Sequence, residues 1–337
     1  MNTPIKIYML GNVNSYLDEA QKNIANRLFK ELSEKHDVRY ENAKENLFNF
    51  KFWKRINEFD PDIIHVFLRP TTFVLLYGKL FRILTKKTKI IISAFQPPQV
   101  PYKCTMIIEI LKPDLYLTIS NQLTNYFKDL GCNAIVLPCG VDVQKFKPVN
   151  KERKMKLRKK YNIPQNKFVV LHVGHATKAR NLSVFKNLLD DKIQSIFVSS
   201  KSFNIDKTLV RELKQSGCIT FCDYIENIEE LYQLADCYVF PTINESNSIA
   251  LPLSVLEAMA CNIPVIATRF GALSELFKDD GSFLFFNGTT EDLAEKIQLI
   301  MKSHRTVANR DKVLKFDWKN VTKKLEDIYQ AVHSNGL

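Results

Sequence analysis

Short apolar runs alternate along the chain with longer amphipathic segments. In the first 150 residues, strands are predicted at 5–10, 37–40, 63–67, 89–94, 115–119 and 134–137. Apolar side chains recur every three or four residues over 19–35, 73–84 and 122–130, which predicts helices. Strands that are apolar on both faces and alternate with helices indicate a parallel sheet covered by helices. The pattern therefore predicts an α/β fold.

The same alternation restarts after residue 160. A second series of strands is predicted at 168–173, 195–198, 219–221, 237–240 and 265–267. The strongly basic stretch 148–160, PVNKERKMKLRKK, separates the two series, and we interpret it as a linker with solvated charges. We expect one domain over residues 1–149 and another over 150–315, with a ligand cleft between them. A C-terminal helix is expected from about Asp317 to Val332, within residues 316–337.

The composition is that of an ordinary globular protein, with 45% hydrophobic and 25% charged residues in 337. No apolar run approaches the roughly 18 residues of a membrane-spanning helix. The best candidate, Ile63–Tyr77, is broken by His65 and Arg69. The run at 5–10 ends at Gly11 and indicates a strand rather than a signal peptide.

The seven cysteine residues lack paired spacing, so we expect free thiols and a cytoplasmic location.

The net charge of +12 favours an anionic partner, which is a nucleic acid, an anionic lipid or a phosphorylated small molecule. Nucleic acid is disfavoured because no basic strip with interleaved aromatic residues and no known binding motif is present. A nicotinamide oxidoreductase is disfavoured because neither series of strands begins with a GxGxxG turn. A phosphorylated small molecule or a lipid remains.

The segment 236–275 carries the strongest candidate site. It predicts a strand, a polar loop, a helix that begins near 251–254, and a second strand at 264–267. Such a loop lies at the carboxyl end of a strand, where open α/β sheets bind ligands. The first N–H groups of the helix favour a diphosphate. Glu257, one turn inside the helix, can accept two hydrogen bonds from a ribose diol, although a glutamate favoured there by the helix dipole alone is the alternative.

The segment LPLSVLEAMACNIPVIAT (251–268) resembles the nucleotide-sugar-binding segment of family 4 retaining glycosyltransferases. Further pieces agree in order, namely PDIIHVF (61–67), LTISNQLTNYFKDLG (117–131), VLPCGVDVQKFKP (136–148), VLHVGHATKARNL (170–182), ELYQLADCYVFPT (230–242) and FDWKNVTKKLEDIY (316–329). The resemblance implies the GT-B fold, in which two Rossmann-like domains carry parallel sheets that face each other across a cleft. It also implies that the C-terminal helix returns to the N-domain.

The activity that the resemblance implies is transfer of a sugar from a nucleoside diphosphate sugar to an acceptor hydroxyl. The acceptor is a glycan, a lipid-linked molecule or a small molecule. In the family's Glu-x7-Glu pair, the second glutamate contacts the donor ribose and corresponds to Glu257. The first position holds Ile249, so Glu245 or Asn247 is expected to contact the donor sugar instead. His175 and Arg180 match the basic pair that neutralises the diphosphate.

The resemblance therefore yields one set of expected site residues. Catalytic roles fall to Arg180, Glu245 and Glu257. Donor binding is assigned to Gly11, Asn12, Gly174, His175, Arg180, Ile249, Ala250, Leu251, Leu253 and Glu257. No metal and no other cofactor is expected, because basic residues and a helix N-terminus are present to stabilise the leaving diphosphate.

Other motifs are interpreted as structural. Asp60-Pro61-Asp62 is formally a DxD metal motif, but it stands at a proline-marked entry to a strand. His65 ends a strand and is interpreted as a core histidine with satisfied hydrogen bonds. Gly140-Val141-Asp142 is interpreted as shaping the crossover between the domains.

Two alternatives stay open. The predicted helix 73–84 places Phe73, Leu76, Tyr77, Leu80, Phe81 and Leu84 on one face with basic residues beside them. We favour a face turned to the core, and peripheral contact with an anionic membrane is the alternative. For the whole chain, the alternative to catalysis is a degenerate GT-B protein that binds a nucleotide sugar or a partner glycosyltransferase, because Ile249 replaces the family's first glutamate.

Overall fold

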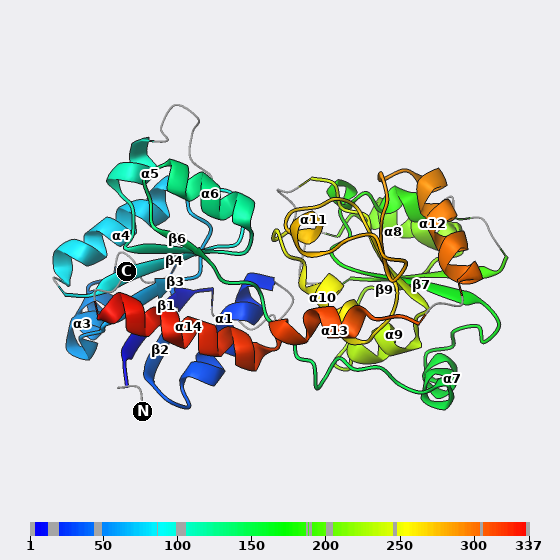
Figure 1. Cartoon of the computed structure of the whole chain (residues 1–337), viewed down its shortest axis with the longest axis horizontal. Coiled ribbons are helices and arrows are strands. Elements are labelled where there is room, and N and C mark those ends of the chain that lie inside the picture. The colour runs from blue at the N-terminus through cyan, green and yellow to red at the C-terminus, as the bar shows by residue number, and fades with distance from the viewer. Residues whose placement is uncertain are drawn as a thin grey trace. The chain divides into compact units, whose positions relative to one another are not determined.

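The structure is a computed structural model that describes residues 4–12, 20–43, 49–85, 87–98, 106–186, 188, 191–199, 205–244, 248–303 and 306–334. The chain divides into two compact units (Figure 1). Unit 1 comprises Met1–Gly140, Ile249–Leu251 and Trp318–Leu337, and unit 2 comprises Val141–Ser248 and Pro252–Asp317. Glu245 and Asn247, two of the expected site residues, lie outside the described residues.

Unit 1 is built on a six-stranded parallel sheet in the order β2-β1-β3-β4-β5-β6. The strands are β1 (Lys6–Gly11), β2 (Asp37–Asn42), β3 (Ile63–Val66), β4 (Lys89–Ala94), β5 (Leu115–Thr118) and β6 (Ala134–Val136). All six strands predicted for the first series are confirmed. Their apolar runs are continuous because helices cover both faces of the sheet.

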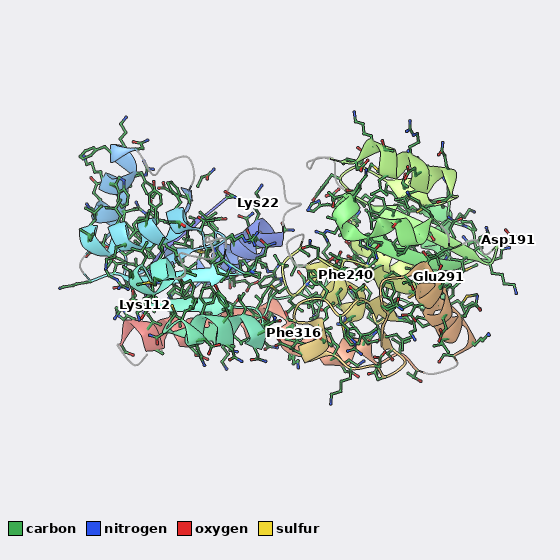
Figure 2. The ribbon with its side chains drawn as sticks, turned by 90° about the horizontal axis from the view of Figure 1, so that it is seen from above. Lys22, Lys112, Asp191, Phe240, Glu291 and Phe316 are labelled. Carbon is green, nitrogen blue, oxygen red and sulfur yellow. The ribbon has the colours of Figure 1, made fainter. Side chains whose placement is uncertain are left out.

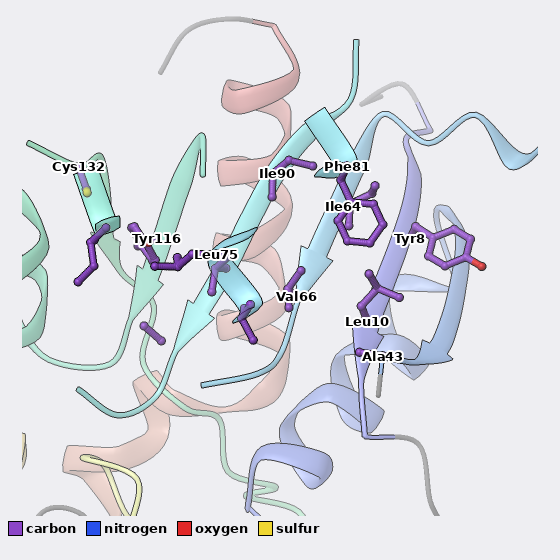
Figure 3. Close-up of a cluster of buried hydrophobic side chains, with 14 of the residues drawn as sticks. Tyr8, Leu10, Ala43, Ile64, Val66, Leu75, Phe81, Ile90, Tyr116 and Cys132 are labelled. Atoms are coloured by element: carbon purple, nitrogen blue, oxygen red, sulfur yellow. The ribbon is translucent and has the colours of Figure 1, made fainter. Parts of the chain in front are cut away.

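Successive side chains of these strands point to opposite faces of the sheet, and each face forms its own core layer. One layer includes Tyr8, Leu10, Ile64 and Val66, and Figure 3 shows these side chains on the sheet face opposite the C-terminal helix. The helices on this face are α3 (Phe50–Phe59), α4 (Thr72–Leu84), α5 (Met106–Ile110) and α6 (Asn121–Asp129). The other face carries α1 (Ala20–Leu32) and the C-terminal helix α14 (Trp318–His333), which pack together.

Two contacts hold α14 against the rest of unit 1. His65 is fully buried, with Nδ1 at 2.5 Å from the Tyr329 hydroxyl and Nε2 at 2.8 Å from Ser93 Oγ. The prediction of a satisfied core histidine is confirmed. Gly140 faces the Trp318 indole so closely that a Cβ would lie 2.4 Å from the ring. Only glycine fits this position, which is the last residue of unit 1 before the chain enters unit 2.

The Asp60-Pro61-Asp62 motif is structural, as predicted. Asp60 has a positive φ of 49° and ends α3 as its C-cap. The Asp62 carboxylate accepts a hydrogen bond from the Lys6 backbone N–H at 2.8 Å, which fixes the start of β1. Within the described residues, no helix combines the length and the apolarity that crossing a bilayer requires.

The predicted orientation of helix 73–84 is confirmed for Phe81, which is buried, and for Tyr77, which packs against the core, but it is wrong for the other four residues. In α4 the buried side is formed by Val74, Leu75 and Phe81, with Gly78 between them. Phe73, Leu76, Leu80 and Leu84 are exposed instead of facing the core. The helix is apolar on two opposite sides, so its sequence periodicity does not determine which side is buried.

Unit 2 has a six-stranded parallel sheet in the order β12-β11-β10-β7-β8-β9. The strands are β7 (Phe168–Val173), β8 (Ile193–Val198), β9 (Ile219–Phe221), β10 (Cys237–Phe240), β11 (Val265–Ala267) and β12 (Phe283–Phe285). The five predicted strands are confirmed, and β12 is an addition. Figure 2 shows Phe240 in the interior of this unit and Asp191 and Glu291 at its surface.

Helices cover both faces of this sheet (Figure 1). They are α7 (Lys151–Lys160), α8 (Lys207–Gln215), α9 (Glu229–Leu234), α10 (Leu253–Ala260), α11 (Leu273–Leu276), α12 (Thr290–Lys302) and α13 (Asn309–Val313), with 3-10 turns at Lys178–Arg180, Leu182–Phe185 and Leu314–Phe316. One core cluster lies between the sheet and α8, the Leu182–Phe185 turn and α12.

The basic stretch 148–160 is not a linker, although most of its charged side chains are exposed, as predicted. Residues 151–160 form helix α7, whose first turn is capped by the Asn150 side chain, which accepts from the Arg153 N–H at 2.9 Å. Two acidic residues of unit 2 hold the helix by ion pairs. Asp236 pairs with Lys154 at 2.6 Å and with Arg158 at 2.5 Å, and Glu230 pairs with Arg153 and Lys160.

Candidate functional site

The strand order of unit 2 reverses at one point. β8 and β9 lie on one side of β7, whereas β10, β11 and β12 lie on the other. Open α/β sheets bind ligands beyond the carboxyl ends of the strands at such a switch point. The segment Gly174–Arg180 follows β7, and the loop that leads to α10 follows β10. Most of the expected donor-binding residues therefore lie in the two segments at this point.

Arg180 is the most unusual side chain at the switch point. It ends the 3-10 turn Lys178–Arg180 and is only 8% exposed. Its guanidinium forms no ion pair and no side-chain hydrogen bond with any described residue. Burial lowers the pKa of Arg180, but a guanidinium in a protein stays protonated. A largely buried charge without a protein partner is costly, so this position favours an anion.

Gly174 makes room for two polar side chains. A Cβ at this position would lie 2.8 Å from His172 Nε2 and 3.6 Å from Arg180 Nη1. The backbone N–H of Gly174 donates to the Val198 carbonyl oxygen at 2.9 Å, which extends the β7–β8 pairing by one residue. The glycine therefore brings the backbone close to both the guanidinium and the imidazole.

His172 was not among the residues predicted for the site. It is fully buried in β7, and its Nδ1 lies 2.8 Å from the Val239 carbonyl oxygen. Burial lowers the pKa of His172 to about 3, so the ring is neutral and its proton is on Nδ1. Nε2 is left as a buried acceptor that has no hydrogen-bond partner. This second unsatisfied polar group lies beside Gly174, near Arg180.

Tyr238 connects the two halves of the site. Its hydroxyl lies 3.3 Å from the Val173 carbonyl oxygen, at the end of β7, and 2.7 Å from Ser254 Oγ, in the first turn of α10. A hydroxyl has one proton, so Tyr238 donates to Val173 and accepts from Ser254. This fully buried side chain fixes the start of α10 against the end of β7.

Glu257 is half-buried in the second turn of α10, and Tyr232 orients it. The Tyr232 hydroxyl, on α9, donates to Glu257 Oε2 at 2.7 Å. Burial raises the pKa of the Glu257 carboxyl, and the Tyr232 hydrogen bond and the positive charge of Lys145 partly oppose this. The other carboxylate oxygen has no hydrogen bond within the described part of the chain. The arrangement leaves an oriented acceptor for a ligand hydroxyl.

The N-terminus of α10 supplies further donors. Pro252 is the N-cap and offers no side-chain cap. The N–H groups of Val255 and Leu256 bond to the Pro252 carbonyl oxygen, at 3.2 and 3.4 Å. Those of Leu253 and Ser254 have no backbone acceptor among the described residues. Two free N–H groups at a helix N-terminus favour an anion.

The remaining expected residues are placed as follows. His175 is half-buried, and its carbonyl oxygen accepts from the Thr177 N–H at 2.9 Å. Ile249 and Leu251 are buried, and Ile249–Leu251 group with unit 1. An alkyl side chain at 249 offers no carboxylate to a sugar.

Gly11 and Asn12 lie in unit 1, at the end of β1. Tyr40 packs directly on Gly11, where a Cβ would lie 2.9 Å from its hydroxyl, so this glycine is explained by packing within unit 1. Asn12 lines a cavity of about 440 Å³ together with residues from β3, α4 and their connection. The strand order reverses between β1 and β3, so this cavity lies at the switch point of unit 1.

The cavity of unit 1 is mainly apolar. Its walls include Leu10, Val66, Val74 and Phe81, whereas Asn12, Gln21, Arg69 and Thr71 supply the polar groups. Its volume is in the range of pockets that hold small-molecule ligands. No group of three or more His, Cys, Asp or Glu side chains that could hold a metal ion occurs within the described ranges of either unit.

Comparison with known proteins places these features in a family. Residues 153–313, which contain Arg180, Tyr238 and Glu257, match the family model of glycosyl transferases group 1. This segment of the chain is therefore similar to group 1 glycosyltransferase domains. The sulfoquinovosyl transferase of Arabidopsis thaliana is 27% identical over 201 residues, which are 56% of this chain and 38% of that protein. The chain spans about half the length, or less, of the first curated relatives that it matches.

Solved glycosyltransferase structures share the fold over nearly the whole chain. A glycosyltransferase from Rickettsia africae has a TM-score of 0.81 at 17% identity, covering 98% of this chain and 99% of that one. The Anabaena protein HepE, solved with UDP, has a TM-score of 0.77 at 16% identity and covers 97% of this chain and 100% of that one. The fold is therefore GT-B, as the resemblance to family 4 glycosyltransferases implies.

Proposed function

We propose that this chain is a retaining glycosyltransferase that moves a sugar from a nucleoside diphosphate sugar to an acceptor hydroxyl. The observation that carries the proposal is Arg180, a buried guanidinium without a described carboxylate partner at the carboxyl end of β7. A diphosphate supplies the missing negative charge, and a guanidinium binds phosphate oxygens in a bidentate manner. The UDP bound to the GT-B neighbour HepE supports this choice of ligand.

The polar groups at the unit 2 switch point have two roles in this proposal. Arg180 and the Leu253 and Ser254 N–H groups bind the diphosphate, and Glu257 accepts from the ribose hydroxyls. As the glycosidic bond breaks, negative charge grows on the departing diphosphate, and donors that are already oriented stabilise it without reorganisation. These groups supply charge neutralisation from the protein itself, so we propose transfer without a metal ion.

The acceptor belongs to unit 1 in this proposal. Its apolar cavity offers Asn12 and Thr71 as partners for an acceptor hydroxyl and Val74 and Phe81 for an apolar part. A glycan, a lipid-linked molecule and a small molecule remain the acceptor classes. A cytoplasmic location fits the described cysteine residues, which are free thiols.

A thermal-shift panel of nucleotides and nucleotide sugars, with and without EDTA, tests donor binding. A ligand at 100 times its dissociation constant adds about 2.7 kcal/mol to the free energy of unfolding. We expect one donor to raise the Tm, and EDTA to leave the shift unchanged. A shift that EDTA abolishes would contradict metal independence, and no shift with any donor would contradict the nucleotide-sugar site.

The reaction itself is tested with the donor that the panel selects. The full chain is incubated with this donor and with candidate acceptors, and the anomeric configuration of the product is read by proton NMR. We expect a product with the donor's configuration. An inverted product would overturn the retaining assignment while leaving donor binding intact.

One observation favours a second candidate, a GT-B protein that binds a nucleotide sugar without transferring the sugar. Ile249 is buried and alkyl at the position where the family's first glutamate contacts the donor sugar. Tight donor binding would support this candidate if it is accompanied neither by sugar transfer nor by slow hydrolysis of the donor. Release of free sugar from the donor would exclude it.

A further inference from the structure

Helix α4 of unit 1 exposes a continuous apolar stripe. Half of the 14 large apolar side chains that are exposed in the described part of the chain lie on α4 and on α5, which packs beside it (Figure 1). On α4 they are Phe73, Leu76, Leu80, Ile83 and Leu84, and on α5 they are Met106 and Ile110. We call these seven residues the α4–α5 face.

The stripe on α4 is not an edge of the core. Its positions follow steps of three, four, three and one residues, which places them within about a third of the helix circumference. The buried residues Val74, Leu75 and Phe81 lie on the opposite side. Ile83 is 62% exposed and Met106 69% exposed, so these side chains extend into solvent. Such a contiguous apolar surface marks an interaction site.

The charges on and beside the α4–α5 face are mainly basic, and the one exposed acidic residue on its two helices is Glu109, between Met106 and Ile110 of α5. From Ile63 to Ile108 the sequence contains no aspartate or glutamate but seven basic residues. Of these, Arg82 pairs with Asp114 at 3.0 Å, beyond the acid-free stretch. Lys79 and Lys87 are exposed and form no ion pair with any residue that the structure describes. The α4 side of the face is therefore an apolar strip beside two lysine side chains without a described ionic partner, and Glu109 on α5 offsets only part of this positive charge.

We propose that the α4–α5 face binds the surface of an anionic lipid bilayer. Apolar side chains enter the boundary between head groups and acyl chains, and lysine side chains beside them contact anionic head groups. A second copy of this chain fits less well, because a two-fold interface would bring the same basic face against itself. An anionic bilayer complements both the apolar strip and its charge.

A bilayer on the α4–α5 face would also favour a lipid-linked acceptor, and this part of the inference rests on the proposed function. Phe73 and Tyr77 of α4 line the apolar cavity of unit 1, and Phe73 belongs to the α4–α5 face as well. The cavity and the face therefore meet at one residue. An acceptor anchored in the bilayer by an acyl chain would reach the cavity at this point.

Co-sedimentation of the full chain with lipid vesicles tests the proposal and requires neither donor nor turnover. One set of vesicles contains phosphatidylglycerol in phosphatidylcholine, and the other contains phosphatidylcholine alone. We expect binding to the anionic vesicles to be at least tenfold tighter and to weaken as salt is raised. Equal and poor binding to both sets would overturn the proposal.

Two variants and a matched control locate the surface. The double variant Leu76→Glu/Ile83→Glu is expected to lose at least tenfold in vesicle affinity. Leu299→Glu on α12 changes an equally exposed leucine of unit 2, 49% against 52% for Leu76, and is expected to bind as the unchanged chain does. An equal loss in the control, or none in the double variant, would contradict the assignment.

Charge and self-association are tested separately. In Lys79→Glu/Lys87→Glu, the affinity for anionic vesicles should fall about fivefold or more for each lysine that is replaced. The affinity for neutral vesicles should change little. Matching circular dichroism spectra and Tm values show that each variant is folded. If the unchanged chain is instead a dimer without vesicles and Leu76→Glu/Ile83→Glu makes it a monomer, the occupant is a second copy and the bilayer proposal is wrong. Failure of sugar transfer would leave these vesicle results unaffected.

Discussion

His65 in unit 1 and His172 in unit 2 are both fully buried, and burial lowers the pKa of each to about 3. His65 uses both ring nitrogens, on Tyr329 and Ser93. His172 uses Nδ1 alone and leaves Nε2 without a partner. Nearly all buried polar groups in proteins are paired, so an exception needs a cause. The unpaired nitrogen of His172 lies beside the residues that we assign to the diphosphate.

The two arginines near the strand ends differ in the same way. In unit 1, Arg69 beside the cavity donates from Nε to the Pro97 carbonyl oxygen at 2.9 Å. In unit 2, Arg180 is buried without a described partner. The two sheets are alike in strand number and direction, so the sheet does not determine the ligand. The two arginines distinguish the two ends, because Arg180 is the more buried and has no described protein acceptor, and this favours an anion beside it.

The largest expected effect is on Arg180. Arg180→Met should weaken donor binding about 100-fold, because a bound diphosphate loses a desolvated charge partner worth about 2–5 kcal/mol. Without donor, the Tm should stay the same or rise, because a buried charge without a partner is removed. Lys178→Met, which removes an exposed cation of the same 3-10 turn, is the control. A large loss of Tm in Arg180→Met would show that the guanidinium serves the fold.

The two histidines should differ in their effect on stability. His65→Leu leaves the Tyr329 and Ser93 hydroxyls without partners and should lower the free energy of unfolding by about 2–4 kcal/mol. His172→Leu leaves only the Val239 carbonyl oxygen unpaired and should cost about 1–2 kcal/mol. Urea unfolding measures both. Equal losses would remove the distinction between the two environments.

A smaller effect is expected at the ribose position. Glu257→Gln keeps an oxygen that accepts from Tyr232 but removes the negative charge, so donor affinity should fall about tenfold, or 1.4 kcal/mol. The Tm without donor should change little. Glu291→Gln, on the surface of α12, is the control. Unchanged donor affinity in Glu257→Gln, measured by calorimetry, would contradict the assignment of this carboxylate.

The smallest effect is a pH dependence in unit 2. Burial by itself raises the pKa of Glu230, but hydrogen bonds from Lys160 and Tyr161 outweigh this and hold the pKa below its ordinary value of 4.5. A carboxyl with a lowered pKa stabilises the fold above its unfolded-state value and loses this contribution as the pH falls through the folded-state value. Glu230→Gln should therefore lower the Tm at pH 7, and the difference should shrink toward pH 3. A constant difference would contradict this role of the ion pairs.

The sequence predicts the fold better than it predicts how surfaces are used. The buried strands are evident because runs such as Ile90-Ile91-Ile92 are covered on both faces. Helix α7 is not evident because KERKMKLRKK has almost no apolar periodicity, and its partners, Glu230 and Asp236, lie some 70 residues further along the chain. The orientation of α4 is missed because both of its sides are apolar.

The residues of the candidate site are also predicted only in part from the sequence. Arg180 and Glu257 stand in motifs that a resemblance can locate. His172, Tyr232 and Tyr238 have no such signal, because an aromatic residue in an apolar strand or helix is usually a core residue. Their importance depends on where one polar atom points, as with the Tyr238 hydroxyl between Val173 and Ser254. Such contacts arise only when distant segments fold together.

The central claim is that the switch point of unit 2 binds a diphosphate through Arg180. The most direct test compares the affinities of a nucleoside diphosphate and of the matching nucleoside, by calorimetry, in the unchanged chain and in Arg180→Met. We predict that the diphosphate contributes at least tenfold less to the affinity of the variant, a coupling of about 1.4 kcal/mol or more. An equal contribution of the diphosphate in both proteins would contradict the claim.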